Sequence, residues 1–547
     1  MSGAELSDLD RLYRQGRISR RQFVLGLAAL GLTPGTIAAL AGGEPVQAAE
    51  PIRPEYLVVI TLDACRPDYL QLADMPVLNS LIKSGTSYDR AWVGQLESET
   101  PTGHVSLSTG ATPRHTGVIG FEWRNPRTGK EALDGWPKWV RAGDLERDLK
   151  ASNANSIPRA VKAAEPHAKI VTVSSEKVHA ADGMGGPWAD YILFHERVGS
   201  GRNTLLPRGM PGHTPHPDFF RPASLHSHLP LTSFGQWDAL SDTMALHALT
   251  QFRPKVLMVN LPGIDVYGHA AGGPVNEFVM RQVVEGADRS LGRIMDAYRR
   301  AGIVEKTLVV VVGDHGMVSN THTVAKETVQ RAVTAAGGRY FFHTGGTAAD
   351  IYLHNPWHAR AVAEQVARIP HVAGAYYLAR HGNTREYVRV PGATMDPEIE
   401  RSYHYLLSTY LGPTSPDVVG VYRENTIGEA YDVARGDHGG LNWGAQHVPL
   451  VLSGPGIASG VVSHFPARLI DVAPTVLRRL GIKPSRMDGV VLADALTDAT
   501  AAEVAAQTAL AAPLTAIQDG IMAAAEADIA ADQKAHAHPP VLPYTRP

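Results

Sequence analysis

Cysteine is nearly absent from this chain of 547 residues, because Cys65 is the single one. A chain with one cysteine has no intramolecular disulfide, no zinc ribbon and no cysteine-ligated iron–sulfur cluster. Net charge is also scarce, since 51 basic and 54 acidic residues give a formal charge of −3. We therefore expect no nucleic-acid polymer as a partner, because proteins with that role carry a basic excess.

A long uninterrupted hydrophobic run is lacking as well. The most apolar stretch, residues 23–40, is barely long enough to cross a bilayer and is broken by Gly31 and Pro34. It follows the pair Arg20-Arg21 and precedes small residues, as in a signal peptide of the twin-arginine route. We predict that residues 1–48 are a cleaved twin-arginine signal peptide and that no stable membrane anchor remains. The twin-arginine export machinery is then a partner, and the mature protein is periplasmic or extracellular.

The remaining composition is that of an ordinary globular protein, with 44% hydrophobic and 19% charged residues. Its length suits one large α/β domain that carries an insertion. A β-branched run at residues 308–312 is typical of a strand buried on both faces of a parallel sheet. Asp314 and His315 follow it between two glycines, at the end of the strand where such sheets bind ligands. We predict an α/β fold with a doubly wound, mostly parallel sheet flanked by helices.

Two further strands end in the same way. Residues 56–62 lead into Asp63, and residues 255–261 lead into a loop with Asp265 and His269. An aspartate after a strand is most often a helix cap or a turn residue, so each motif alone leaves that alternative open. The number of similar strand ends favours a site for divalent metal, because carboxylate and imidazole groups both bind zinc.

Five motifs taken together are far more specific than any one of them. Asp63 is followed by Arg-Pro-Asp-Tyr-Leu at residues 66–70, and Thr100 lies four residues before His104. The other three motifs are residues 265–269, 314–317 and 436–440. In this order they resemble the alkaline phosphatase superfamily, and particularly its type I phosphodiesterase/nucleotide pyrophosphatase branch. The resemblance covers most of residues 56–320 and returns at residues 430–480.

The resemblance implies a site for two divalent metal ions, with zinc as the expected metal. One ion would be held by Asp63, Asp314, His315 and the Thr100 oxygen, and the other by Asp265, His269 and His438. Three carboxylates and three imidazoles without a thiolate make two three-ligand sites with open positions. Two metals about 4 Å apart stabilise both the attacking and the departing oxygen of an in-line displacement.

The same resemblance implies that Thr100 is the nucleophile and that a phosphothreonine forms. A threonine hydroxyl is a poor nucleophile at neutral pH, but coordination to a divalent cation lowers its pKa. The alternative for Thr100 is a capping hydroxyl before Pro101.

Two positions refine or depart from the pattern. Phe121 stands where the phosphodiesterase branch usually has an asparagine that donates to a phosphate oxygen. Loss of such a donor costs about 3 kcal/mol of transition-state stabilisation unless another group replaces it. Lys177 is the candidate replacement and catalytic residue, because a similar lysine contacts the phosphoryl oxygens in monoesterase and phosphonoacetate-type relatives. The alternative is an ordinary surface lysine.

Cys65 invites comparison with sulfatases, which use a cysteine-derived nucleophile. The residues from Cys65 to Asp68 lack the Cys-x-Pro-x-Arg pattern, and they lie on the wrong loop. A small buried thiol is the better interpretation.

A β-α-β pattern between two ligand motifs predicts an inserted α/β lid at residues 341–432. The catalytic core would then comprise residues 51–340 and 433–495. Residues 496–547 are predicted as a C-terminal helical segment and tail.

These features predict an exported two-metal phosphoesterase that hydrolyses phosphodiester or pyrophosphate bonds of a small phosphate-ester substrate. One alternative is a phosphate monoesterase or a phosphonoacetate-type hydrolase. Another alternative, suggested by Phe121, is an inactive relative that binds substrate without turning it over.

Overall fold

The computed structural model describes residues 11–13, 23, 53–126, 129, 131–133, 144–197, 205–210, 212–213, 234–344, 346–382, 384–392, 394–428 and 436–535. The chain forms two compact units, Met1–Ile52 and Arg53–Pro547. In the first unit the ring of Phe23 stacks on that of Tyr13, with centroids 4.4 Å apart. The predicted signal peptide lies almost entirely outside the described residues and stays a prediction.

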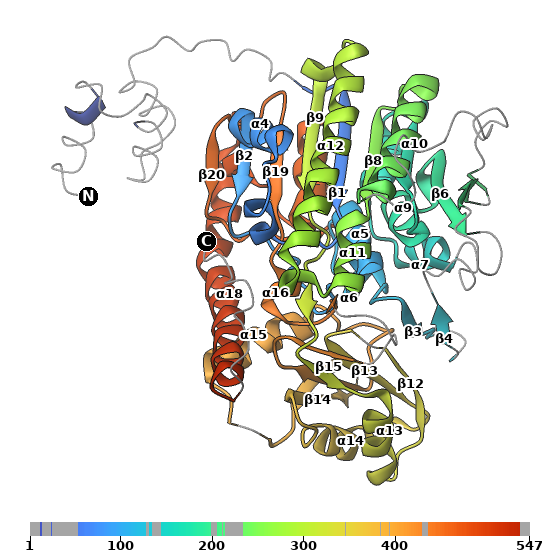
Figure 1. Cartoon of the computed structure of the whole chain (residues 1–547), viewed down its shortest axis with the longest axis vertical. Helices are drawn as coiled ribbons and strands as arrows, with labels where there is room; N and C mark the ends of the chain where they lie inside the picture. Colours follow the sequence, from blue (N-terminus) through green and yellow to red (C-terminus); the bar gives the residue numbers. More distant parts are fainter. Residues whose placement is uncertain are drawn as a thin grey trace. The chain divides into compact units, whose positions relative to one another are not determined.

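A nine-stranded sheet forms the centre of the second unit, in the order β20-β2-β19-β9-β1-β8-β5-β6-β7 (Figure 1). Its middle strands are parallel: β9 (Thr307–Val312), β1 (Tyr56–Leu62), β8 (Val256–Leu261), β5 (Ile170–Ser174) and β6 (Tyr191–Arg197). The outer strands are β20 (Val461–Ser463), β2 (Gly85–Tyr88), β19 (Leu450–Ser453) and β7 (Leu205–Gly209). Antiparallel pairing occurs at β19 and at β7. The predicted mostly parallel sheet is confirmed.

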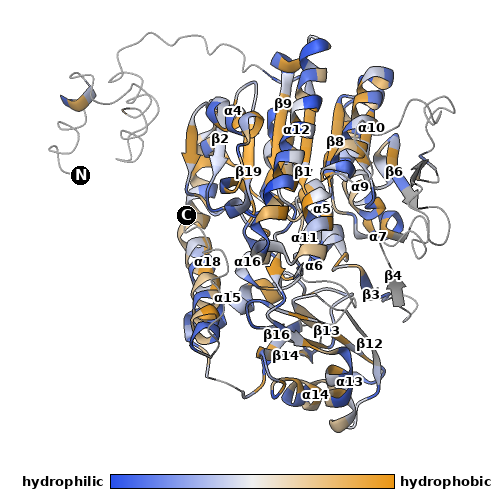
Figure 2. Ribbon diagram, viewed as in Figure 1, coloured by the Kyte–Doolittle hydropathy of each residue, from blue (hydrophilic) through white to orange (hydrophobic). Residues whose placement is uncertain are grey.

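Helices cover both faces of this sheet, because its central strands are apolar on both sides (Figure 2). In β1, Leu57 and Val59 belong to one hydrophobic core, and Val58 and Ile60 belong to another. The first core contains α5 (Thr100–Thr109), α8 (Ile157–Ala164), α9 (Val178–Gly185) and α17 (Val472–Arg479). The second contains α4 (Pro76–Ser84), α10 (Gln236–Phe252) and α12 (Glu277–Arg300). The two cores make the sheet the middle layer of three.

A second sheet of five antiparallel strands has the order β12-β13-β16-β14-β15. Its strands are β12 (Tyr340–Thr344), β13 (Ala348–Leu353), β14 (Val372–His381), β15 (Thr384–Arg389) and β16 (Val418–Tyr422). Helices α13 (Lys326–Ala335) and α14 (Ala359–Val366) pack on it through a hydrophobic core of their own. These strands fall largely within the residues predicted as a lid.

The C-terminal helix α18 (Ala501–Ala535) lies beside α15 (Pro397–Ser408), which precedes β16 (Figure 1). Shorter elements complete the unit: β3 (Glu122–Arg124), β4 (Glu131–Leu133), α6 (Pro113–Thr116), α7 (Asp144–Ser152), β11 (His322–Val324), β17 (Thr426–Gly428) and α16 (Trp443–Gln446). No helix in the described part of the chain combines the length and the apolar composition that a bilayer crossing requires.

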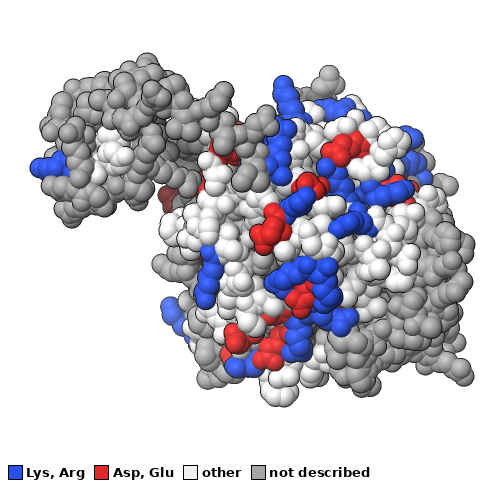
Figure 3. Space-filling view, turned by 90° about the horizontal axis from the view of Figure 1, so that it is seen from above, with Lys and Arg blue, Asp and Glu red and all other residues white. Residues whose placement is uncertain are grey.

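The molecule seen from above carries Lys and Arg side chains interspersed with Asp and Glu (Figure 3). Among the exposed ion pairs of the described residues is that of Lys306 with Glu55, at 2.8 Å. Such mixing gives this face no extended field of one sign.

Candidate active site

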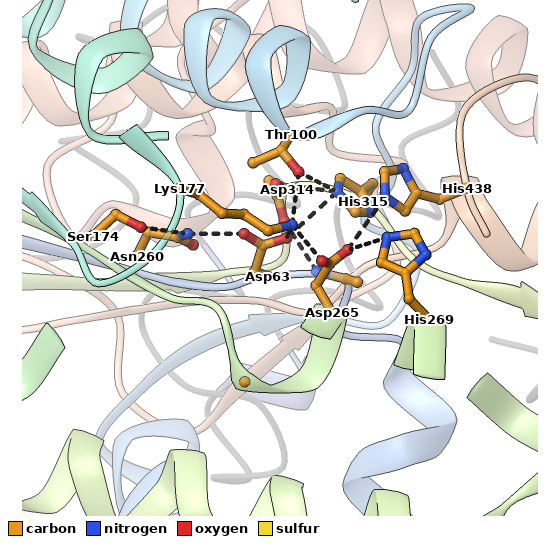
Figure 4. Close-up of polar contacts among 12 residues, drawn as sticks. Asp63, Thr100, Ser174, Lys177, Asn260, Asp265, His269, Asp314, His315 and His438 are labelled. Carbon is orange, nitrogen blue, oxygen red and sulfur yellow. Dashed lines mark hydrogen bonds and ion pairs between the residues drawn. The ribbon is translucent and has the colours of Figure 1, made fainter. Parts of the chain in front are cut away.

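The carboxyl ends of the central strands bring the predicted ligands together (Figure 4). Asp63 follows β1, Asp314 and His315 follow β9, and α11 (Gly263–Ala271) after β8 carries Asp265 and His269. His438 arrives from far along the chain because β18 (Gly436–Asp437) pairs with β10 (Val318–Ser319), just beyond His315.

Three overlapping clusters have ligand atoms that lie within 4.8 Å of one another: Asp63, Asp314 and His315; Asp265, His315 and His438; and His269, Asp437 and His438. All six predicted metal ligands therefore gather at one place.

Thr100 is the first residue of α5 and is fully buried. Its Oγ1 lies 3.1 Å from His315 Nε2 and 3.2 Å from Lys177 Nζ. The N-cap of α5 is Glu99, so the capping alternative for the Thr100 hydroxyl does not describe this helix. The hydroxyl instead lies beside His315, which belongs to two of the three clusters.

The three imidazoles share one hydrogen-bonding pattern. Nδ1 of His315 lies 2.9 Å from the carbonyl oxygen of Gly316, Nδ1 of His269 lies 2.8 Å from that of Gly436, and Nδ1 of His438 lies 3.1 Å from that of Ser98. Because a carbonyl oxygen can only accept, each Nδ1 carries a hydrogen, and Nε2 presents a lone pair whenever the ring is neutral. Metal-binding histidines are held in this way by their outer partners.

The carboxylates are also held by neighbours. Asn260 Nδ2 donates to Asp63 Oδ2 at 2.8 Å, and the backbone N–H of Ala64 donates to Asp314 Oδ1 at 3.2 Å. Asp265 Oδ1 lies 3.2 Å from His438 Nε2 and 3.3 Å from His269 Nε2, and Asp314 Oδ2 lies 3.2 Å from His104 Nδ1. Several buried carboxylates and neutral imidazoles that meet at one place form a donor set that fits bound divalent cations.

Lys177 lies at the centre of the site rather than on the surface. Its Nζ contacts Asp265 and lies 3.3 Å from Asp63 Oδ1, and its side chain is 11% exposed. Burial lowers the pKa of Lys177, but Asp265 and Asp63 more than offset this and hold the pKa above its ordinary value. The ammonium is therefore charged beside the Thr100 hydroxyl.

The three carboxylates differ in how burial and nearby charges shift their pKa values. Burial and then Asp314 raise the pKa of Asp63 to about 8. Burial opposes ionisation of Asp265 too, but Lys177 and His269 hold the pKa of Asp265 well below its usual range. Burial lowers the pKa of His315 to about 3, which leaves this ring neutral and able to bind a metal.

A family model described as type I phosphodiesterase / nucleotide pyrophosphatase matches residues 57–440. The chain belongs to this family. It is thus a phosphoester hydrolase of the alkaline phosphatase superfamily, as the sequence motifs predict. No curated protein sequence matches the chain significantly.

Solved structures of the superfamily share the fold. The alkaline phosphatase PafA has a TM-score of 0.62 at 17% identity, over 81% of this chain and 99% of that one. Murine ectonucleotide pyrophosphatase / phosphodiesterase 5 has a TM-score of 0.56 at 16% identity, over 81% of this chain and 100% of that one. The human protein of the same name has a TM-score of 0.54 at 14% identity, with the same coverage.

Several residues that support the site of this phosphodiesterase family member escaped the sequence analysis. His104 Nδ1 lies 2.8 Å from the Thr100 carbonyl oxygen and 3.2 Å from Asp314 Oδ2, and its spacing of four from Thr100 was the available signal. Asn260 is a polar residue in an otherwise apolar strand, and Asp437 adjoins His438. Each signal is local and weak, because the partner that gives it meaning is far away in the sequence.

Phe121 lies near the nucleophile but offers the site no side-chain donor. Its backbone N–H donates to Glu99 Oε2 at 3.1 Å, and its ring meets His179 edge to face with centroids 4.9 Å apart. The departure at this position therefore leaves a backbone N–H bonded to Glu99 and an aromatic ring packed on His179.

Proposed function

We propose that this protein hydrolyses phosphodiester or pyrophosphate bonds with two bound divalent metal ions and with Thr100 as the nucleophile. Zinc is the proposed metal. The observation that carries the proposal is the position of Thr100 Oγ1, which lies 3.1 Å from His315 Nε2 and 3.2 Å from Lys177 Nζ. His315 belongs to two of the three ligand clusters. Asp63, Asp314, His315 and Thr100 would hold one ion, and Asp265, His269 and His438 the other.

Bound divalent cations would lower the pKa of the Thr100 hydroxyl and neutralise charge on the phosphoryl group. The donor set of carboxylates and imidazoles without thiolate suits zinc. The hydrogen bonds of the three Nδ1 atoms to backbone carbonyl oxygens support this proposal, because they leave the Nε2 atoms for metal binding.

The chain's own residues account for the remaining steps. Thr100 Oγ1 attacks phosphorus, a new O–P bond forms, and the bond to the leaving oxygen breaks. The Lys177 ammonium, 3.2 Å from Oγ1, lies where it can stabilise the negative charge that develops on the phosphoryl oxygens. Water then displaces the Thr100 oxygen from phosphorus, which releases the phosphate monoester and restores the hydroxyl.

The related structures support a nucleotide-like substrate. The murine phosphodiesterase was solved as an inactive threonine-to-alanine variant in complex with AMP. Two observations favour the alternative of a phosphate monoesterase: the buried Lys177 beside the nucleophile, and the fold similarity to the alkaline phosphatase PafA. The complete ligand set around Thr100 argues against an inactive relative.

Hydrolysis of two chromogenic esters tests the proposal. We expect purified protein to hydrolyse bis-p-nitrophenyl phosphate faster than p-nitrophenyl phosphate, to lose both activities with a chelator, and to recover them with zinc. A preference for the monoester would favour the phosphatase alternative. Absence of turnover despite two bound zinc ions would favour the inactive relative.

We also propose that the protein is exported by the twin-arginine route, on the strength of the sequence pattern in residues 1–48. The expected result is a mature N-terminus near Ala48 in periplasmic or secreted material. Replacement of Arg20-Arg21 by Lys-Lys would then leave the full precursor in the cytoplasm. A mature terminus at Met1 outside the cytoplasm would contradict the proposal.

A further inference from the structure

The imidazole of His104 lies between the helix that carries Thr100 and the proposed metal ligand Asp314. His104 follows Thr100 by four residues on α5, and its side chain is fully buried. Its Nδ1 lies 2.8 Å from the Thr100 carbonyl oxygen and 3.2 Å from Asp314 Oδ2. The ring therefore touches both the residue that carries the proposed nucleophile and a residue that would hold a metal ion.

Only one nitrogen of this ring makes a hydrogen bond within the described part of the chain. Because the Thr100 carbonyl oxygen can only accept, Nδ1 carries a hydrogen and donates it. The same N–H attracts the carboxylate oxygen of Asp314 that lies beside it. Nε2 is enclosed and has no hydrogen-bond partner among the described residues. The polar contribution of the ring is thus made through Nδ1.

A histidine at such a position is a costly way to fill space. A buried ring nitrogen without a partner is unfavourable, and an apolar side chain of similar size would avoid that cost. An apolar side chain could not, however, donate to the Thr100 carbonyl oxygen or attract the Asp314 carboxylate. The choice of residue therefore favours a role in the site over a role in filling the core.

Three elements of the site pack together around this ring. A Cβ atom on Gly183 of α9 would lie 3.3 Å from His104 Cβ, and α9 has Lys177 as its N-cap. On the other side, a Cβ atom on Gly103 would lie 2.6 Å from the Asp314 carbonyl oxygen. These close contacts leave the ring little room to shift, so its Nδ1 is held at a fixed place between α5 and the loop after β9.

We propose that His104 is a positioning residue that couples Thr100 to the metal ion held by Asp314. Its Nδ1–H fixes the backbone of Thr100 relative to the Asp314 carboxylate, so that the nucleophilic oxygen and the ligand oxygen keep one spacing. The effect on turnover rests on the function proposed above. The effect on metal binding does not, because it is measured without turnover.

Two amide substitutions distinguish the two ring nitrogens. The side-chain NH₂ of asparagine lies near the position of Nδ1, whereas that of glutamine reaches toward the position of Nε2. His104→Asn should therefore keep the affinity for zinc within about threefold of the wild type. His104→Gln should weaken the binding of one of the two zinc ions about 10- to 100-fold, as measured by competition with a chelator of known affinity.

Turnover of bis-p-nitrophenyl phosphate with zinc in excess is the second readout. His104→Gln should lower kcat roughly 10- to 100-fold and change KM much less, because a displaced nucleophile slows the chemical step without removing a contact to the substrate. His104→Asn should restore most of this loss. A residue that only filled space would not distinguish the two amides in this way.

His447→Gln is the matched control, since it places the same substitution at another buried histidine. Its Nε2 lies 2.9 Å from the Asp89 carbonyl oxygen, and neither residue belongs to the ligand clusters. At pH 8 this variant should keep the zinc affinity and the kcat of the wild type even if it melts at a lower temperature. Equal losses of zinc affinity in His447→Gln and His104→Gln would assign the effect to general loss of packing and overturn the inference.

The inference is also overturned if His104→Asn and His104→Gln bind zinc equally tightly, or if His104→Asn binds it more weakly. A wild type that binds two zinc ions without turning over the diester would contradict the proposed function alone, and the zinc affinities of the two variants would still decide the role of His104. If His104→Gln does not fold, His104→Leu takes its place, because leucine fills the space without a donor.

The expected order of zinc affinity is then wild type, His104→Asn and, well below both, His104→Leu.

Discussion

At the scale of single residues, outer partners decide where the ligand atoms point. Backbone carbonyl groups hold the Nδ1 side of His269, His315 and His438, and Asn260 holds Asp63. These contacts orient the ligand atoms toward one another. Loss of an outer partner should therefore weaken metal binding more than it weakens the fold.

Asn260→Leu should reduce zinc affinity about 10- to 100-fold, because it removes the donor to Asp63 Oδ2 at nearly constant volume. Competition with a chelator of known affinity measures the effect. Thr61→Val is the matched control: Thr61 is the register partner of Asn260 on β1, is fully buried, and has an Oγ1 without a hydrogen-bond partner. Equal affinities of the two variants would remove Asn260 from this role.

Thr100→Ala should lower turnover about a thousandfold or more while zinc content stays close to normal, because the nucleophile is lost and six ligands remain. Thr100→Ser should keep measurable activity, since it retains a hydroxyl. Thr102→Ala is the control, because Thr102 is equally buried in α5 and its Oγ1 has no hydrogen-bond partner. Unchanged turnover in Thr100→Ala would exclude the proposed mechanism.

His447 makes stability depend on pH. Its Nε2 lies 2.9 Å from the carbonyl oxygen of Asp89, its ring stacks on Trp443, and burial lowers its pKa to about 4. The unfolded chain, with a histidine pKa of about 6.5, binds more protons between these two values, so stability rises with pH there. This contribution is complete above pH 6.5 and is lost as pH falls toward 4.

Between pH 6.5 and pH 4, protonation of His447 lowers the free energy of unfolding by about 3 kcal/mol. His447→Gln should flatten the dependence of the unfolding free energy on pH between 4 and 6.5, as measured by urea titration. At pH 8 the imidazole is neutral in the folded and the unfolded state, so the unfolding free energies of wild type and variant differ only through the packing of the side chain. An unchanged pH slope in the variant would contradict the assignment.

At the scale of elements, the contact between α5 and the loop after β9 sets the distance from Thr100 to His315. Gly103 permits this contact, because a Cβ atom there would lie 2.6 Å from the Asp314 carbonyl oxygen. Backbone cannot move aside as a side chain can. The helix that carries the nucleophile would have to shift instead.

Gly103→Ala should lower kcat roughly 10- to 100-fold, because displacement of a reacting group by about 1 Å has effects of that order. An alanine within a helix otherwise stabilises by about 1 kcal/mol relative to glycine. Gly292→Ala in α12 is the control, because the nearest neighbour of its Cβ would be a methyl group of Val77 at 3.1 Å. Equal kcat in both variants would show that α5 tolerates the substitution.

At the scale of the whole unit Arg53–Pro547, α18 joins the two sheets. Gln518 donates to the Arg90 carbonyl oxygen at 2.8 Å, near β2 of the large sheet. Asp528 pairs with Arg423 at 2.7 Å and accepts the Glu424 backbone N–H at 3.0 Å, directly after β16. The helix also buries Ile521, which is 1% exposed.

Ile521→Ala should lower the free energy of unfolding by about 3 kcal/mol, as is usual for truncation of a buried isoleucine. Val504→Ala on the same helix should change it by less than about 0.5 kcal/mol, because Val504 is 38% exposed. Chemical denaturation monitored by fluorescence measures both. If Ile521→Ala lowered the free energy of unfolding no more than Val504→Ala does, packing of α18 would contribute little to the stability of the unit.

The strands and the side chains that follow them were predictable, since their signals are contiguous. The apolar runs before Asp63, Asp265 and Asp314 have the length and composition of buried strands, and the carboxyl ends of parallel strands share one edge. The family motifs added Thr100, Lys177 and His438, and the structure brings all of these residues together. The lid boundaries, the metal identity and the signal peptide stay predictions.

What the sequence alone determined was the content of the site, because residue type and strand pattern are local properties. Tertiary structure alone decided the order of the strands, the contact of Asn260 with Asp63 across 197 positions, and the meeting of Glu97 with Asp350. The physical reason is that these contacts form only when the folded sheets bring segments together that are far apart in the sequence. No short stretch of residues specifies such a contact.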